Sequence, residues 1–132
     1  MITYPAPVVA DLVGVTYHQL DYWDRTGVCS PTVAAAGSGT HRGYTKRDVT
    51  LLRLMAFLSR QEVSTDTLRC LAAADLRQYI DEEGRWTEEA IIIHSGRRLA
   101  YVGDLGTSEC RQALNALAVT CTVVRLWGIP DK

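Results

Sequence analysis

A cluster of hydrogen-bonding and charged side chains lies within residues 16–26, a stretch that the sequence predicts to be a short helix. Thr16 is a natural N-cap for this helix, and Gly27 is suited to end it. Leu20 and Trp23 lie three residues apart and can pack inward. The other side then carries polar side chains, those of Tyr17, His18, Asp21 and Arg25. Hydrogen-bonding groups with a cation on one helix side are suited to contact base edges in the major groove of duplex DNA.

The elements before this helix are predicted to hold it in a helix-turn-helix. Apolar residues at helical spacing follow Pro5 and Pro7 and predict a first helix that Gly14 ends. A tight turn through Gly14 and Val15 then leads directly to Thr16. Two short helices joined in this way form a helix-turn-helix candidate.

A glycine-rich loop and two more helices are predicted to follow. Val33-Ala34 and residues 42–44 flank the loop and are expected to pair as a small hairpin, which we call the wing, although a plain surface loop would have the same composition. Thr45 and Asp48 form a capping-box pattern at the start of a third helix. A fourth helix is predicted to begin at Ser64 or Thr65, with helical character continuing to residue 84.

The last third of the chain has strand-like patterns. AIIIHS and LAYVGD predict a hairpin, ECRQALNALA a helix, and TCTVVRLW a third strand. We therefore expect an α+β protein with three parts: a four-helix DNA-binding unit with a wing at residues 1–74, a helical linker at 75–85, and a β-β-α-β unit at 86–132. The last unit is too small to bury both faces of a sheet by itself, so it should pack on the rest of the chain or on a second copy.

Composition indicates an ordinary soluble chain. Of its 132 residues, 47% are apolar and 22% charged. No apolar run approaches the roughly 18 residues that a membrane span needs. The N-terminus lacks a cationic segment before an apolar run, so no secretory signal is expected and the protein is predicted to be cytoplasmic, associated with the nucleoid.

Charge is unevenly distributed although the net charge is only −1. Residues 41–60 hold five basic side chains and one acid, whereas residues 75–89 hold six acids and two bases. This pattern suggests one surface for phosphates and another for different contacts, although two solvated faces of opposite sign would produce it as well.

Catalysis and metal binding have no sequence signal. The cysteines are Cys29, Cys70, Cys110 and Cys121, and none lies at metal-ligand or redox spacing. No nucleophile–base pair or phosphate-binding loop is visible. We expect neither enzymatic activity nor a cofactor, a metal or a small-molecule effector.

Several linked motifs in residues 8–74 resemble the MerR family of transcriptional regulators, especially actinobacterial and actinophage members. The segments are VADLVGVTYHQLDYWDRTGVCSP and RGYTKRDVTLLRLMAFLSRQEVSTDTLRCL. They carry GVT before the second helix, L-x-Y-W-D, TGV-x-SP, R-x-Y-T after the loop and D-V-x-x-L in the third helix. The resemblance implies a winged helix-turn-helix that binds a pseudo-palindromic site as a dimer and bends the DNA between the half-sites.

The resemblance also implies roles for single residues. The positions that approach bases are Thr16, Tyr17 and His18, and the positions that hold phosphates are Tyr22 and Arg42, with Tyr44 beside them. Charge alone adds three further phosphate candidates: Arg25, Lys46 and Arg47.

The chain departs from the family pattern in two places. Asp21 stands where the family usually has arginine; it would repel a phosphate, accept a hydrogen bond from a cytosine amino group, or orient a neighbouring arginine. Residues 86–132 replace the long helix through which many members dimerise, and we expect this unit to dimerise instead.

We therefore expect a sequence-specific regulator of transcription. Its predicted partners are duplex DNA, a second copy of the chain through residues 86–132, and RNA polymerase or another protein. Two alternatives remain open at this point: an architectural accessory factor of recombination, similar to an excisionase, and a protein-interaction module with secondary DNA binding.

Overall fold

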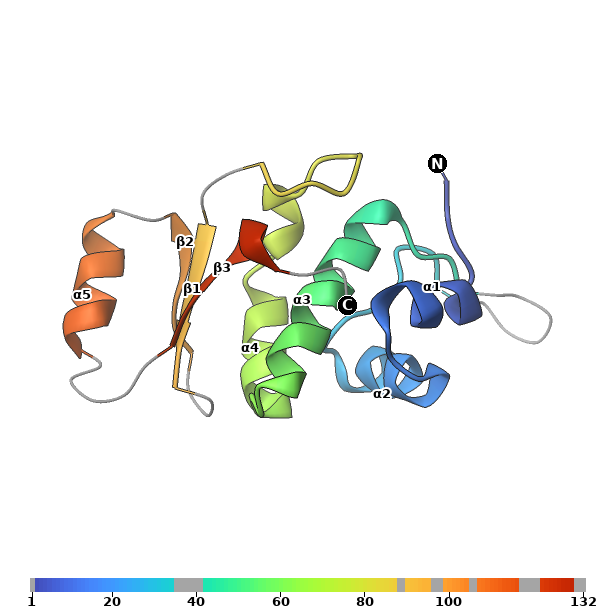
Figure 1. Ribbon diagram of the computed structural model, residues 1–132, viewed down its shortest axis with the longest axis horizontal. Coiled ribbons are helices and arrows are strands. Elements are labelled where there is room, and N and C mark those ends of the chain that lie inside the picture. Colours follow the sequence, from blue (N-terminus) through green and yellow to red (C-terminus); the bar gives the residue numbers. More distant parts are fainter. Residues whose placement is uncertain are drawn as a thin grey trace.

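A helical part and a small sheet lie side by side in an elongated molecule (Figure 1). The computed structural model describes residues 2–34, 42–87, 90–95, 99–104, 107–116 and 122–129. The glycine-rich tip of the predicted wing lies outside the described residues. The helical part and the C-terminal strands and helix agree with the expected α+β class.

The first two helices have the caps that the sequence predicts. α1 (Ala6–Val13) ends at Gly14, which has a φ of 81°. α2 (Tyr17–Thr26) begins after Thr16, whose side chain accepts a hydrogen bond from the Gln19 amide at 3.1 Å, and ends at Gly27 with a φ of 78°. Both glycines have left-handed backbone conformations, which cost little without a Cβ atom. The turn between the helices is therefore tight, as expected for a helix-turn-helix.

The third helix is the centre of the core. α3 (Lys46–Arg60) has a complete capping box between Thr45 and Asp48, and α4 (Thr65–Ala73) is capped by the Ser64 side chain. Leu52, Leu54 and Met55 of α3 are wholly buried. Because α1 and α4 both contact α3, this helix determines how the others are arranged.

The expected helical linker over residues 75–85 has a different conformation. Asp75 has a positive φ of 51°, and only Leu76–Tyr79 (η1) continue as a 3-10 helix. An isolated bridge then pairs Ile80 with Trp86. Leu76 and Ile80 are each 2% exposed and belong to the main core, so hydrophobic burial against α3 outweighs the local helical preference.

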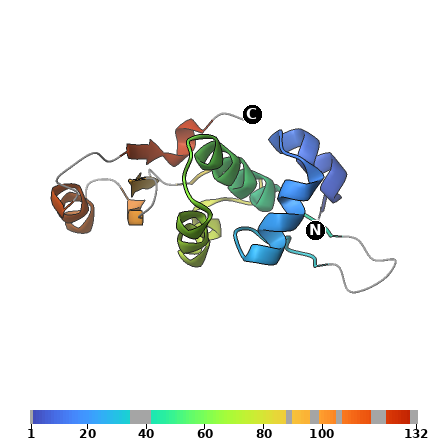
Figure 2. The same cartoon turned by 90° about the horizontal axis from the view of Figure 1, so that it is seen from below.

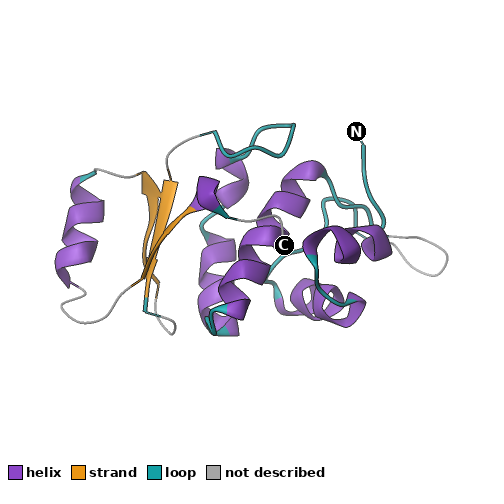
Figure 3. Ribbon diagram, in the orientation of Figure 1, coloured by secondary structure: helices purple, strands orange, loops and turns teal. Residues whose placement is uncertain are grey.

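Three antiparallel strands form the C-terminal sheet. β1 (Ala90–His94) lies between β2 (Leu99–Asp104) and β3 (Thr122–Arg125), and η2 (Leu126–Gly128) follows directly. α5 (Ser108–Ala116) covers one side of the sheet and α4 lies on the other, as Figure 3 shows. Ile92, Val124 and Leu126 join the same buried cluster as the helical part, so one core spans both parts.

No helix within the described ranges is both long enough and apolar enough to cross a membrane.

Candidate nucleic-acid interface

One side of α2 is exposed and polar, while its other side is anchored in the core. Leu20 and Trp23 are 0% and 1% exposed, whereas Tyr17 and Tyr22 are 51% and 40% exposed. Thr16 and His18 also lie at the surface. α1 and α2 lie together at the end of the molecule opposite to α5 (Figure 2). The helix thus presents hydroxyl, phenol and imidazole groups outward on a rigid support.

Four charged residues lie together, three on α2 and one directly before Gly43; we call them the Asp21 cluster: Asp21, Asp24, Arg25 and Arg42. Arg42 donates from Nη2 to Asp21 Oδ1, and its Nε lies 3.1 Å from Asp24 Oδ2. Arg25 Nε donates to Asp21 Oδ2 at 2.9 Å. The two arginines hold the pKa of Asp21 below its ordinary value by hydrogen bonding, with Arg42 contributing most. Asp21 is therefore charged at neutral pH and bound to both cations.

Arg42 is fixed from both sides. Its neighbours Gly43 and Tyr44 pair with Val33 and Tyr4 in isolated bridges, and the bridge to Tyr4 holds this segment against the start of the chain. The Arg42 guanidinium lies 6.0 Å from the centre of the Tyr17 ring. Hydrogen bonding to Asp21 raises the pKa of Arg42. The cluster therefore connects the segment at Arg42 to α2, the helix predicted to read bases.

Lys46 and Arg47 face a different part of the chain. Lys46 Nζ lies 3.5 Å from a carboxylate oxygen of Glu83, and Arg47 Nε donates to the Ile80 carbonyl at 2.8 Å. These contacts stabilise the packing of residues 80–84 on the start of α3. Neither cation joins the Asp21 cluster in the structure, although both are only half-buried.

Tyr44 lies in the core, although it was expected beside the phosphate-holding residues. Its side chain is 0% exposed, and burial raises its pKa to about 12. The Tyr44 hydroxyl has no hydrogen-bond partner among the residues that the structure describes. A side chain without surface access cannot touch a phosphate, so we leave Tyr44 out of the candidate interface.

A buried carboxylate connects the segments behind the interface. Asp48 is 0% exposed and accepts hydrogen bonds from the Thr32 amide at 2.8 Å and the Thr45 amide at 3.0 Å. Arg77 of η1 completes the site with an Nη2–Oδ1 distance of 2.9 Å. Burial raises the pKa of Asp48, but the hydrogen bonds together outweigh it and leave the pKa below its ordinary value. Sequence analysis identified Asp48 only as a capping residue.

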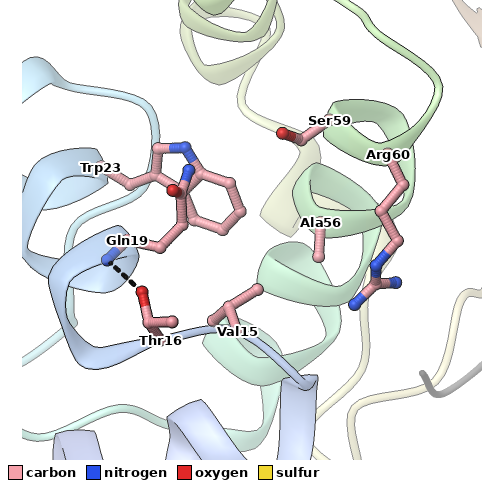
Figure 4. A pocket seen from close by; sticks show the side chains of 7 residues that line it. All are labelled: Val15, Thr16, Gln19, Trp23, Ala56, Ser59 and Arg60. Atoms are coloured by element: carbon pink, nitrogen blue, oxygen red, sulfur yellow. Dashed lines mark hydrogen bonds between the residues drawn. The ribbon is translucent and has the colours of Figure 1, made fainter.

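A hollow of about 200 Å³ lies between the start of α2 and the end of α3, next to Thr16 (Figure 4). Its lining residues are Val15, Thr16, Gln19, Trp23, Ala56, Ser59 and Arg60. Arg60 donates from Nη2 to the carbonyl oxygens of Val13 and Gly14, each at 3.3 Å, and so fixes the end of α1. The sequence identified Arg60 only as part of a basic segment, because its contact with residues far earlier in the chain has no local signal.

Three cysteines lie in the described part of the chain. Cys29 and Cys110 are buried, Cys70 is exposed, and all three are free thiols. Burial raises the pKa of Cys29 to about 12, so this thiol stays protonated. Within the described segments no three histidine, cysteine or acidic side chains come close enough to hold a metal ion.

Residues 4–75 match a known family of regulatory proteins. A sequence profile described as MerR HTH family regulatory protein matches this range. Three relatives are described as uncharacterized HTH-type transcriptional regulators, one from Mycobacterium bovis and two from strains of Mycobacterium tuberculosis. Each is 37% identical over 79 residues, which are 59% of this chain and 35% of the relative. The match thus spans about a third of the length of these curated relatives.

Proposed function

Because the chain belongs to the MerR helix-turn-helix family of regulatory proteins, we propose that it regulates transcription by reading a specific duplex DNA sequence with α2. The family supports DNA binding and transcriptional regulation in general. One observation supports reading of a specific sequence by α2: its polar side faces outward, while Leu20 and Trp23 on its other side are buried in the core. Such a helix can enter the major groove without rearranging its support. We also propose that the protein lies in the cytoplasm with the nucleoid, because DNA is its proposed ligand.

Base contacts are proposed for the start of α2 and phosphate contacts for its end. Thr16, Tyr17 and His18 occupy the first turn, where a recognition helix meets base edges. Arg25 is 65% exposed, and Asp21 contacts only its Nε, so its remaining nitrogens are available to a phosphate. Tyr22 is exposed on the same helix. Phosphate contacts supply affinity and position, whereas base contacts supply discrimination.

We expect Arg25→Ala and His18→Ala to weaken DNA binding in different ways. Arg25→Ala should weaken binding to all sequences and reduce the log–log salt slope by roughly 0.9 per protomer, because one phosphate contact is lost. His18→Ala should cost about 1–3 kcal/mol on the preferred site only, because a base contact is lost. Selection from a random DNA library would supply the preferred site, and fluorescence anisotropy on that site and on a random duplex would measure both variants.

Two results would contradict this division of roles. Equal losses for both variants on both duplexes would remove the distinction between base and phosphate contacts. Absence of duplex binding by the unaltered protein, even in dilute buffer, would overturn the proposed function itself.

A homodimer through residues 86–132 is proposed to place two α2 helices on one pseudo-palindromic site and bend the DNA between half-sites. Among the strands that the structure describes, β3 pairs only with β1, so one edge of β3 is open. Val123 and Trp127 beside this edge are 46% and 42% exposed. Arg125 stacks on Trp127, with its guanidinium 6.0 Å from the ring centre. An open strand edge with apolar neighbours can pair with a second copy.

Sedimentation equilibrium should therefore detect a dimer at micromolar protein, and Val123→Glu should shift it to the monomer. Val8→Glu is the matched control, because Val8 is 44% exposed but lies on α1. A monomeric unaltered protein, or equal effects of the two variants, would contradict a dimer built on β3.

A further inference from the structure

The Asp21 cluster raises a question about how Arg42 can hold a phosphate. The cluster contains two carboxylates and two guanidinium groups, so its formal charge is zero. Arg42 uses Nη2 for Asp21 and Nε for Asp24. Its Nη1 is buried and has no hydrogen-bond partner within the described residues. The side chain is only 17% exposed, so a phosphate can bind Arg42 only by replacing one of the carboxylates.

Asp21 is the carboxylate that can be replaced at lower cost. Its other oxygen, Oδ2, accepts from Arg25, so Asp21 keeps a cationic partner when Arg42 turns away. Among the residues that the structure describes, the Asp24 carboxylate pairs with Arg42 alone. The side chains of Asp21 and Asp24 are 31% and 27% exposed, so the second cationic partner of Asp21 decides between them rather than solvent access. A phosphate oxygen can take the place of Asp21 Oδ1, because both offer the guanidinium a charge-assisted hydrogen bond.

We propose that Asp21 is a specificity-determining residue that competes with DNA phosphates for Arg42. In the free protein Asp21 occupies Arg42. On a random duplex, where phosphate contacts supply nearly all the affinity, Arg42 stays with Asp21 and contributes nothing. On the preferred site, base contacts bring α2 deeper into the groove and Arg42 exchanges Asp21 for a phosphate. This inference rests on the proposed DNA-reading function, and it explains how an acidic residue on the reading helix favours selectivity.

The test is Asp21→Asn, which keeps the shape and removes the charge. Anisotropy titrations between 50 and 200 mM salt would use the preferred site and a random duplex. On the random duplex, the freed Arg42 should steepen the log–log slope of affinity against salt by roughly 0.9 per protomer. For a dimer, affinity should therefore fall about 12-fold further across this salt range than it does for the unaltered protein. On the preferred site the slope should stay as it is, because Arg42 already holds a phosphate there.

Two matched variants separate competition from simple repulsion. Asp66→Asn removes an equal charge from an ion pair with Arg69 on α4, where Asp66 is 85% exposed, and should leave both slopes unchanged. In an Arg42→Gln background, Asp21→Asn should no longer steepen the random-duplex slope. If Asp21→Asn still steepens the random-duplex slope in this background, loss of repulsion alone would explain the steeper slope, and the proposal would be overturned.

Failure of this inference differs from failure of the proposed function. An unaltered protein that binds its selected duplex, together with an unchanged random-duplex slope for Asp21→Asn, would overturn only the competition. An unaltered protein that binds no duplex would overturn both.

Discussion

Asp48→Ala is expected to lower the free energy of unfolding by about 3 kcal/mol, because several donors lose a charged and fully buried acceptor. Asp48 is wholly buried and accepts hydrogen bonds from Thr32, Thr45 and Arg77. Alanine leaves these donors without their acceptor, although Arg77, whose side chain is 37% exposed, can still turn toward solvent. The variant should also loosen the link between the segment before the wing, the start of α3 and η1.

Acid should have a related effect through the same carboxylate. The pKa of folded Asp48 lies below its ordinary value of 3.8, so its ionised form stabilises the folded state. That contribution is fully present above the unfolded value and is lost as the pH falls through the folded value. The difference in stability between the unaltered protein and Asp48→Ala should therefore shrink in this acidic range.

Chemical denaturation followed by circular dichroism would measure the Asp48 effect. Asp66→Ala is the matched control, because its ion pair with Arg69 is exposed and should contribute less than about 1 kcal/mol. Equal losses for Asp48→Ala and Asp66→Ala would show that the buried carboxylate does not organise these segments.

Trp23→Ala is the second substitution with a large expected effect, a loss of about 3–5 kcal/mol in stability. Trp23 is 1% exposed and belongs to the main buried cluster. It also borders the hollow beside Ala56 of α3 (Figure 4). Removing the indole would enlarge this space and release the inner side of α2, so DNA affinity should fall together with stability.

Tyr17→Ala provides the contrast on the same helix. Tyr17 is 51% exposed, so its loss should change the free energy of unfolding by less than about 0.5 kcal/mol while still weakening DNA binding. Denaturation and anisotropy on the same samples would separate the two effects. A stable Trp23→Ala variant with unaltered DNA affinity would contradict the assignment of Trp23 to the support of α2.

The helices could be predicted from the sequence because their signals are local. Thr16, Gly14 and Gly27 act within one turn of the helix ends that they define, and the pattern of Thr45 and Asp48 lies within four residues. Each signal depends on backbone hydrogen bonds that need no information about the rest of the fold. The existence of α1 to α4 therefore followed from short segments.

The partners of the charged residues could not be predicted, because they lie far apart in the chain. Arg42 meets Asp21 across 21 positions, and Arg77 meets Asp48 across 29. A charge count identifies cations but not the carboxylates that already hold them. Tyr44 illustrates the same limit, since its place beside a phosphate position in the sequence did not indicate a buried ring. The change from helix to a 3-10 turn after Asp75 could not be predicted either, because it depends on the packing of Leu76 in the core.

The core that continues from α3 into the sheet has a geometric consequence for operator choice. Leu20 of α2 shares one buried cluster with Ile92 and Val124, so α2 and the sheet move together rather than about a loose connection. In a dimer built on β3, the separation of the two α2 helices would then be determined by side-chain packing. Such a protein would accept few distances between half-sites, and core substitutions far from DNA would alter which operators it can span.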